Sequence, residues 1–241
     1  MSAIQSKPPL LDRLELDDGA SILESGDRLR RDEFERRYHA MPGVKKAELI
    51  DGIVYIPSPV RLKRHGRPHV LIVTWLGYYL AKTPGLEEFG DNATVRLDDD
   101  NEPQPDLLLC LPKSLGGRAS VSEDDYLEGA AEFVAEVAAS SVSIDTHLKL
   151  QVYRRHGVRE YVIWRVEDKA VDWFSLREGR YEPLATDAEG LFRSDIFPGL
   201  WLDPAALIRG DLPRLFQVLD EAARTPEHAA FVQRLNAQKA P

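Results

Sequence analysis

Two short apolar segments, each carrying one carboxylate, constrain the fold most strongly. Asp106 follows Pro105 and precedes the run LLLCL at 107–111, which prolines bound on both sides. Glu136 lies inside the run FVAEVA at 133–138. Segments of this length and apolar content predict strands buried on both faces of a sheet. Because a buried carboxylate is costly without a compensating cation, the two positions indicate a site at a core sheet.

A lysine follows the second segment on a predicted helix. Apolar residues recur at helical spacing over about 144–156, Ser143 is a candidate N-cap in front of them, and Gly157 stands behind them. These are start and stop signals of a helix, and Lys149 lies within it. The lysine is therefore carried by the element that directly follows the Glu136 strand.

A fourth polar residue lies in a predicted hairpin. In KKAELIDGIVYIPSP, at 45–59, two alternating segments flank Asp51 and Gly52, a strong signal for a two-residue turn. Glu48 belongs to the first arm of this hairpin. A cross-strand salt bridge is the simpler alternative for its carboxylate.

The spacing of apolar residues and the stop signals between segments predict the remaining helices and strands. We expect a helix at 27–41 capped by Asp27, a helix at 63–82 that is regular after Arg67, a strand over 87–97, a loop-rich stretch at 112–131 with a short helix near 124–129, a three-stranded meander after Gly157, and helices near 211–224 and 226–237.

The predicted fold class is α/β, with a central mixed sheet flanked by helices, an N-terminal helix and a C-terminal helical tail. The 241 residues suffice for one sizeable domain with decorations. We expect a loose extension at 1–26, the main domain at 27–208 and the helical tail at 209–241.

Charge excludes a globally basic nucleic-acid binder. The chain has 31 basic and 40 acidic residues and a net charge of −9. Its basic residues are concentrated at 61–67, which reads RLKRHGR. This counts against a passive DNA-binding module and less against a nuclease, whose metal ions supply positive charge locally.

Other classes lack their sequence signals. The single cysteine, Cys110, lies in an apolar run, which leaves neither a disulfide framework nor a thiolate zinc site. Glycine-rich phosphate loops, GxSxG and HExxH do not occur. No apolar segment approaches the ~20 residues that span a bilayer, so we expect a soluble, cytoplasmic protein with no membrane partner.

Several short motifs together carry a family resemblance. They are ELIDG at 48–52, IPSP at 56–59, His65 at the start of a helix, PD at 105–106, AEVAASS from 135, Asp145 with Lys149 and Tyr153, and GVREY at 157–161. In this order and spacing, over about residues 30–208, the chain resembles the Uma2 family. These bacterial proteins are described as restriction endonucleases of the PD-(D/E)xK nuclease superfamily.

The resemblance implies a restriction-endonuclease-like core and metal-dependent hydrolysis of DNA phosphodiesters by a metal-activated water. Asp106 and Glu136 would be the primary ligands of Mg²⁺ or Mn²⁺, hard ions that prefer oxygen donors. Glu48 would be an outer or second-metal ligand. Lys149 would be the catalytic lysine that orients the water and stabilises developing charge.

A nuclease of this kind also needs residues that bind its substrate and an arrangement that can cut two strands. His65, Arg64 and Arg67 are the candidate substrate-binding residues. Because cleavage of both DNA strands with one site per chain usually calls for two copies, we expect a homodimer.

Two positions depart from the pattern. The superfamily's usual lysine lies two residues after the glutamate, where this chain has Ala138. The Uma2 pattern instead places the lysine on the following helix, which Lys149 matches. Trp164 stands near a position where aspartate is common.

Alternatives stay open. One is a catalytically inactive nuclease-fold protein that binds DNA or a partner protein, and another is a nuclease for RNA or a different phosphodiester. At residue level, Asp106 could end a turn, Glu136 could form a buried ion pair, and Lys149 could pair with Asp145. Tyr153 is expected to be a core residue.

Overall fold

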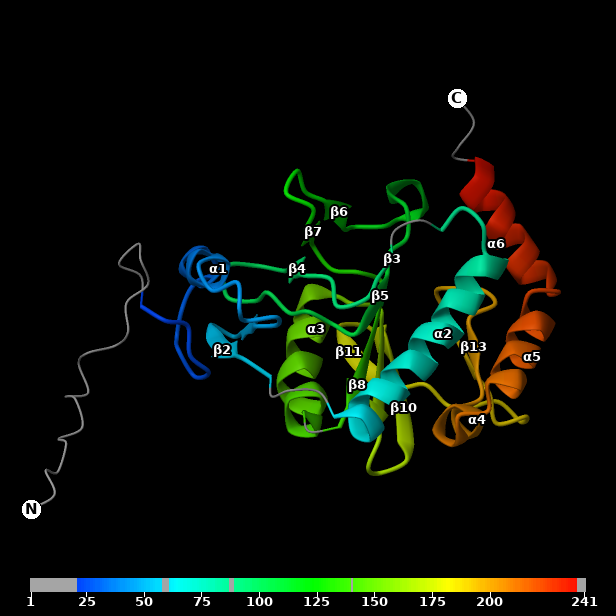
Figure 1. Cartoon of the computed structure of the whole chain (residues 1–241). Coiled ribbons are helices and arrows are strands. Elements are labelled where there is room, and N and C mark those ends of the chain that lie inside the picture. Colours follow the sequence, from blue (N-terminus) through cyan, green and yellow to red (C-terminus); the bar gives the residue numbers. More distant parts are fainter. Residues whose placement is uncertain (1–20, 58–60, 87–88, 140, 238–241) are drawn as a thin grey trace, which may run out of the picture.

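In the described part of the chain, a six-stranded mixed sheet forms the centre of the molecule (Figure 1). The computed structural model describes residues 21–57, 61–86, 89–139 and 141–237, so most of the predicted extension at 1–26 lies outside them. From edge to edge the strands are β11 (Arg180–Pro183), β10 (Ala170–Arg177), β9 (Glu160–Arg165), β8 (Phe133–Ala138), β5 (Leu107–Leu109) and β3 (Phe89–Gly90). Strands β8 and β9 are parallel and the other neighbours are antiparallel. The predicted mixed sheet and its meander are confirmed.

Smaller elements surround this sheet. The other strands are β1 (Glu48–Ile50), β2 (Ile53–Tyr55), β4 (Val95–Arg96), β6 (Ser120–Val121), β7 (Leu127–Glu128), β12 (Phe192–Arg193) and β13 (Trp201–Leu202). The helices are α1 (Arg31–His39), α2 (Arg67–Lys82), α3 (Leu150–His156), α4 (Pro204–Arg209), α5 (Leu212–Ala222) and α6 (Pro226–Ala237), with the π-helical turns η1 (Leu62–Gly66) and η3 (Ile144–Lys149) and the 3-10 turn η2 (Lys113–Leu115). None of the described helices has the length and apolar content needed to cross a membrane.

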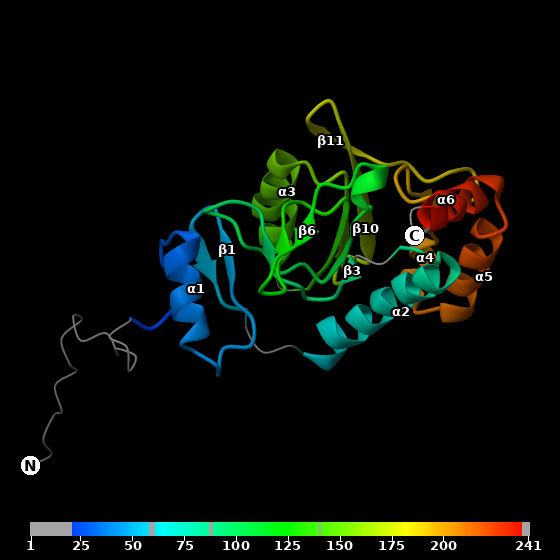
Figure 2. The ribbon, with the colours of Figure 1, turned by 90° about the horizontal axis from the view of Figure 1, so that it is seen from above.

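Helices α2 and α3 cover opposite faces of the sheet (Figure 2). Val137 of β8 belongs to the buried cluster that contains Trp75 of α2. Val134 of the same strand belongs to the cluster that contains Tyr153 of α3. Since successive side chains of a strand point to opposite faces, Glu136 lies on the face that α3 covers.

The C-terminal helices pack beside α2 (Figure 1). Tyr78 of α2 stacks on Phe216 of α5, with ring centroids 4.3 Å apart. Leu219 of α5 and Leu235 of α6 are buried in the same cluster as Trp75. Both predicted C-terminal helices are confirmed, and their apolar faces extend the core on the α2 side of the sheet.

The predicted hairpin is also confirmed. Asp51 and Gly52 join β1 to β2 with φ angles of 50° and 70°, the positive values that a two-residue hairpin turn of this kind requires. The segment that precedes β5 pairs with the hairpin through backbone hydrogen bonds. Leu49 N–H donates to Glu102 O at 3.1 Å, and Glu102 N–H donates to Leu49 O at 2.7 Å. These bonds fix β1 against the segment that leads to Asp106.

Two predicted helix caps are wrong. Helix α1 begins at Arg31 rather than at Asp27, and its N-cap makes no side-chain hydrogen bond. The Asp27 carboxylate instead accepts a hydrogen bond from Glu24 N–H in the preceding turn, at 3.1 Å. Ser143 has φ −67° and ψ −32°, which is already helical, whereas an N-cap residue that bonds the first turn usually has an extended backbone.

Two segments around β5 also differ from prediction. The strand expected over 87–97, of which 87–88 lies outside the described residues, is divided between β3 in the central sheet and β4 in a second sheet. The short helix expected near 124–129 is wrong. Asp125 has φ 67°, which interrupts a right-handed helix. Leu127 then pairs with Val95, so its backbone is satisfied in a strand.

Glu102, whose backbone pairs with Leu49 of the hairpin, has a buried carboxyl group. Glu102 is 2% exposed. Burial and the neighbouring Glu35 carboxylate raise the pKa of Glu102 to about 9, although Arg96 acts in the opposite direction. The Arg96 guanidinium is itself engaged by Glu35 at 2.7 Å. At neutral pH the folded protein therefore keeps Glu102 protonated, whereas the unfolded chain ionises it.

This shift predicts a pH-dependent stability. Between the ordinary glutamate pKa of 4.5 and the raised pKa of about 9, the folded state binds more protons at Glu102 than the unfolded state, so stability falls as pH rises. Glu102→Gln removes that titration and is expected to raise the free energy of unfolding by about 1–3 kcal/mol at pH 8, with little change near pH 5. Urea unfolding at both pH values measures it, with exposed Glu123→Gln as the control. An unchanged pH dependence in Glu102→Gln would contradict the assignment.

Candidate active site

Strand pairing brings the two predicted carboxylates together. Strands β5 and β8 are antiparallel, and Leu107 lies opposite Ala135, so the next pair in register is Asp106 and Glu136. Both side chains are 3% exposed. Asp106 N–H donates to Glu136 Oε2 at 3.4 Å, and Val137 N–H donates to Asp106 Oδ2 at 2.7 Å. Two carboxylates therefore stand side by side on the sheet face that α3 covers.

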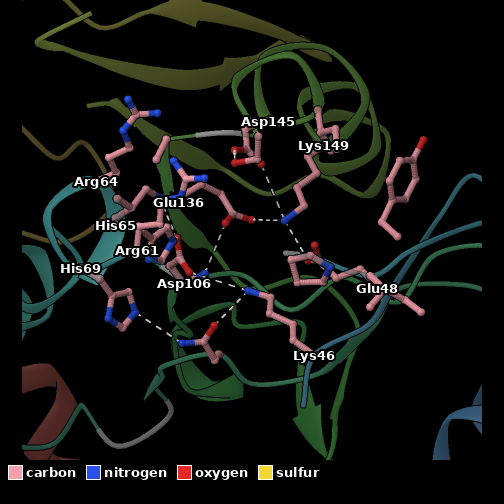
Figure 3. Close-up of a pocket in the computed structure, with 18 of the residues that line it drawn as sticks. Lys46, Glu48, Arg61, Arg64, His65, His69, Asp106, Glu136, Asp145 and Lys149 are labelled. Atoms are coloured by element: carbon pink, nitrogen blue, oxygen red, sulfur yellow. Dashed lines mark hydrogen bonds and ion pairs between the residues drawn. The ribbon is translucent and has the colours of Figure 1, made fainter. Parts of the chain in front are cut away.

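Lys149 projects from the junction of η3 and α3 into this pair. Its Nζ lies 2.8 Å from Glu136 Oε1, 2.8 Å from Glu48 Oε1 and 3.7 Å from Asp145 Oδ1. Figure 3 shows the ammonium between these three side chains. Glu48 Oε1 also accepts a hydrogen bond from Gln104 N–H at 2.7 Å. One lysine thus joins the sheet, the hairpin and its own helix.

Tyr153, which sequence reasoning assigned to the core, contacts the site. Its hydroxyl donates to Glu136 Oε1 at 3.1 Å, and its ring is buried against Tyr161. Tyr153 lies four residues after Lys149, so the two share one face of the helix. That i, i+4 spacing was the signal available in the sequence.

Two basic side chains border Asp106 from the other side. Lys46 Nζ lies 3.7 Å from Asp106 Oδ1, and His65 Nε2 lies 3.5 Å from Asp106 Oδ2. The His65 ring stacks on His69 with centroids 5.6 Å apart. Lys46 was not among the predicted site residues, although it precedes Glu48 by two positions and so points to the same side of an extended chain.

These side chains line a cavity of about 660 Å³. Arg61, Arg64, His65 and His69 contribute basic groups to its lining. Arg64 also pairs with Glu167 at 3.3 Å. Of the predicted substrate-binding residues, His65 and Arg64 line the cavity. The guanidinium of Arg67 lies beside the backbone of Gly210 instead.

The carboxylates in this cavity have divergent acidities. Burial alone would raise the pKa of Asp106, but His65, Lys46 and the Val137 N–H hold it at about 2. Burial raises the pKa of Glu136 to about 8, and nearby carboxylates reinforce the shift against the opposing charge of Lys149. The pKa of Lys149 is raised well above its usual value, because its carboxylate neighbours outweigh burial. The cavity therefore holds more carboxyl groups than lysines, and the raised pKa of Glu136 favours its protonated form at neutral pH.

The donor set fits a hard divalent cation in its chemistry. Asp106 and Glu136 offer adjacent carboxylate oxygens, the ligands that Mg²⁺ and Mn²⁺ prefer. The raised pKa of Glu136 also marks a place where an added positive charge is stabilised. Among the described residues, no group of three or more His, Cys, Asp and Glu side chains is arranged to hold a metal ion.

Comparisons with known proteins agree with the fold. A family model for Uma2, described as "Putative restriction endonuclease", matches residues 31–205. One similar solved structure is "a putative nuclease belonging to DUF820" from Anabaena variabilis, with a TM-score of 0.55 and 14% identity, covering 76% of this chain and 98% of that chain. At this identity the likeness shows a common fold, which confirms the predicted fold class. The comparison with curated proteins gave no match.

The buried lysine should dominate the stability of this region. Lys149→Met leaves Glu48, Glu136 and Asp145 without their ammonium partner, and breaking such buried pairs costs about 3–5 kcal/mol. We expect the free energy of unfolding to fall by about 2–4 kcal/mol at pH 8, with a smaller loss near pH 5, where protons can replace the missing charge.

Chemical unfolding at both pH values measures the loss. Lys113→Met removes an exposed lysine and serves as the matched control. Equal stability of the Lys149 and Lys113 variants would show that the buried pairs contribute nothing net.

Proposed function

The chain belongs to the Uma2 family, described as "Putative restriction endonuclease", and from that membership and the geometry of the cavity we propose that it is a metal-dependent endonuclease that hydrolyses DNA phosphodiesters. The observation that carries the proposal is the meeting of Asp106, Glu136 and Lys149 in a cavity with basic residues in its lining. Phosphodiester hydrolysis needs a hydroxide delivered to an anion and compensation of the charge that develops on its oxygens.

In this proposal Asp106 and Glu136 hold Mg²⁺ or Mn²⁺, and Glu48 is an outer or second ligand. A bound ion of this kind lowers the pKa of a coordinated water and neutralises phosphate charge. Lys149 keeps the Glu136 and Glu48 carboxylates oriented through its 2.8 Å contacts. Its positive charge also favours negative charge that develops next to Glu136.

The basic residues of the cavity account for substrate binding. Arg61, Arg64 and His65 present donors that suit phosphate oxygens, and arginine can bind them in a bidentate manner. The net charge of −9 makes this local concentration of basic groups more important, because the chain as a whole is acidic. Cleavage of both strands would require two copies of the chain, so we also propose a homodimer.

Cleavage of supercoiled plasmid tests the activity directly. With Mg²⁺ or Mn²⁺ the wild type is expected to nick the plasmid, and EDTA should abolish nicking. Asp106→Asn and Glu136→Gln remove a ligand charge with little change in volume, so each should lower the rate by at least about 100-fold. Asp125→Asn, at an exposed carboxylate, should leave it unchanged.

The same assay separates the alternatives. A DNA complex in Ca²⁺ with no cleavage in Mg²⁺ or Mn²⁺ would favour a catalytically inactive binding protein. Preferential cleavage of competing RNA would redirect the substrate assignment. Activity that survives in Asp106→Asn would place the chemistry elsewhere.

Metal binding has a readout that does not depend on cleavage. An ion that binds only the folded state stabilises it by about 2.7 kcal/mol at 100 times its Kd. Mn²⁺ should therefore raise the Tm of the wild type and of Asp125→Asn, and should raise that of Asp106→Asn much less. Equal shifts in all three proteins would show that the ion binds outside this cavity.

A further inference from the structure

The contacts of Lys149 within the cavity limit its ability to bind a substrate phosphate. An ammonium has three N–H donors. At Lys149 they face Glu48 and Glu136 at 2.8 Å and Asp145 at 3.7 Å, and the residue is only 3% exposed. Its two short contacts and its burial leave Lys149 poorly placed to receive an incoming phosphate oxygen, although the Asp145 contact is longer than a hydrogen bond. Its geometry suits holding the carboxylates more than receiving a substrate.

Lys46 has the opposite character. Its side chain is 25% exposed and lines the same cavity. Its ammonium donates a hydrogen bond to the neutral Asn92 Oδ1 at 2.9 Å. The separation of 3.7 Å from Asp106 Oδ1 is longer than a hydrogen bond. Figure 3 shows Lys46 and Lys149 approaching the carboxylates from different sides.

The Asn92 side chain holds the ammonium in this place. It accepts a hydrogen bond from Lys46 Nζ at 2.9 Å, and its own amide donates to Asp91 Oδ1 at 2.8 Å. Asn92 also lines the cavity. A neutral amide acceptor that faces the cavity holds the Lys46 ammonium there without neutralising its charge, which supports a functional rather than a purely solvated lysine.

We propose that Lys46 binds a non-bridging oxygen of the scissile phosphate, opposite Lys149 across the carboxylate pair. The inference rests on the proposed function, since the ligand is a nucleic-acid phosphodiester. It makes Lys46 a catalytic residue that touches the substrate, and it makes Lys149 the residue that positions the carboxylates. His65, on the same side of Asp106, borders the same phosphate position.

Binding without metal tests Lys46 separately from cleavage. A short fluorescein-labelled single-stranded oligonucleotide is titrated with full-length protein in EDTA, and anisotropy is recorded over a range of salt concentrations. Lys46→Met should weaken binding by about 10-fold and lower the slope of log K against log salt by about 0.7, the value for one lost phosphate contact on a single strand. Lys46→Arg should retain most of the affinity.

Lys45 supplies the matched control, because it is the adjacent lysine and is exposed. Lys45→Met should keep the wild-type affinity and salt slope. The inference is overturned if Lys46→Met binds like the wild type, if Lys45→Met loses as much, or if the wild type binds no oligonucleotide. Thermal unfolding of each variant confirms that the proteins compared are folded, and Lys46→Gln, which also removes the charge, replaces Lys46→Met as the test if the latter is not.

Plasmid cleavage by the same variants separates the two proposals. If Asp106→Asn abolishes cleavage while Lys46→Met keeps the wild-type kcat and KM, the endonuclease proposal stands and the role of Lys46 fails. If Lys46→Met loses binding while no variant, including the wild type, cleaves, the phosphate site stands and the endonuclease proposal fails.

Discussion

The ion pairs of one buried ammonium hold the site together. Lys149 Nζ contacts Glu136 on the central sheet, Glu48 on the hairpin and Asp145 on its own helix. Each carboxylate alone would be costly to bury, and the lysine alone would be costlier still. Because the charges compensate one another only in this arrangement, the position of the hairpin and that of α3 are coupled to the geometry of the Glu136 carboxylate. Gln104 N–H donates a further hydrogen bond to Glu48, and the Tyr153 hydroxyl donates one to Glu136.

Carboxyl groups outnumber lysines in this cavity, and their pKa values diverge. Burial and neighbouring carboxylates raise the pKa of Glu136 to about 8, while Lys46 and His65 hold that of Asp106 at about 2. A site optimised for stability alone would pair every charge or replace the ions by apolar groups. Here the carboxyl groups are kept, and the raised pKa of Glu136 favours a proton at the place where a further positive charge is missing.

The parts of the fold that were predictable depend on local pattern. The runs at 107–111 and 133–138 are strands because their apolar content requires burial on both faces, and Asp51-Gly52 forms the hairpin turn because both residues tolerate positive φ. The side of Asp106 on which Lys46 lies depends on how the hairpin docks, which no local period encodes. Tyr153 was hidden for a different reason, since a buried tyrosine on an apolar helix face looks the same whether its hydroxyl meets a core carbonyl or a site carboxylate.

The position of the lysine illustrates how one geometry can arise from two sequence patterns. Ala138 follows Glu136 by two residues on β8, so both point to the face covered by α3. A lysine at 138 would reach the Glu136 carboxylate along the strand. Lys149 reaches the same carboxylate from the helix above, at 2.8 Å. Moving the ammonium from strand to helix keeps its charge in the same space while adding Glu48 and Asp145 as partners. That extra pairing engages Lys149 with carboxylates, and under our proposal it leaves the contact with phosphate to the more exposed Lys46.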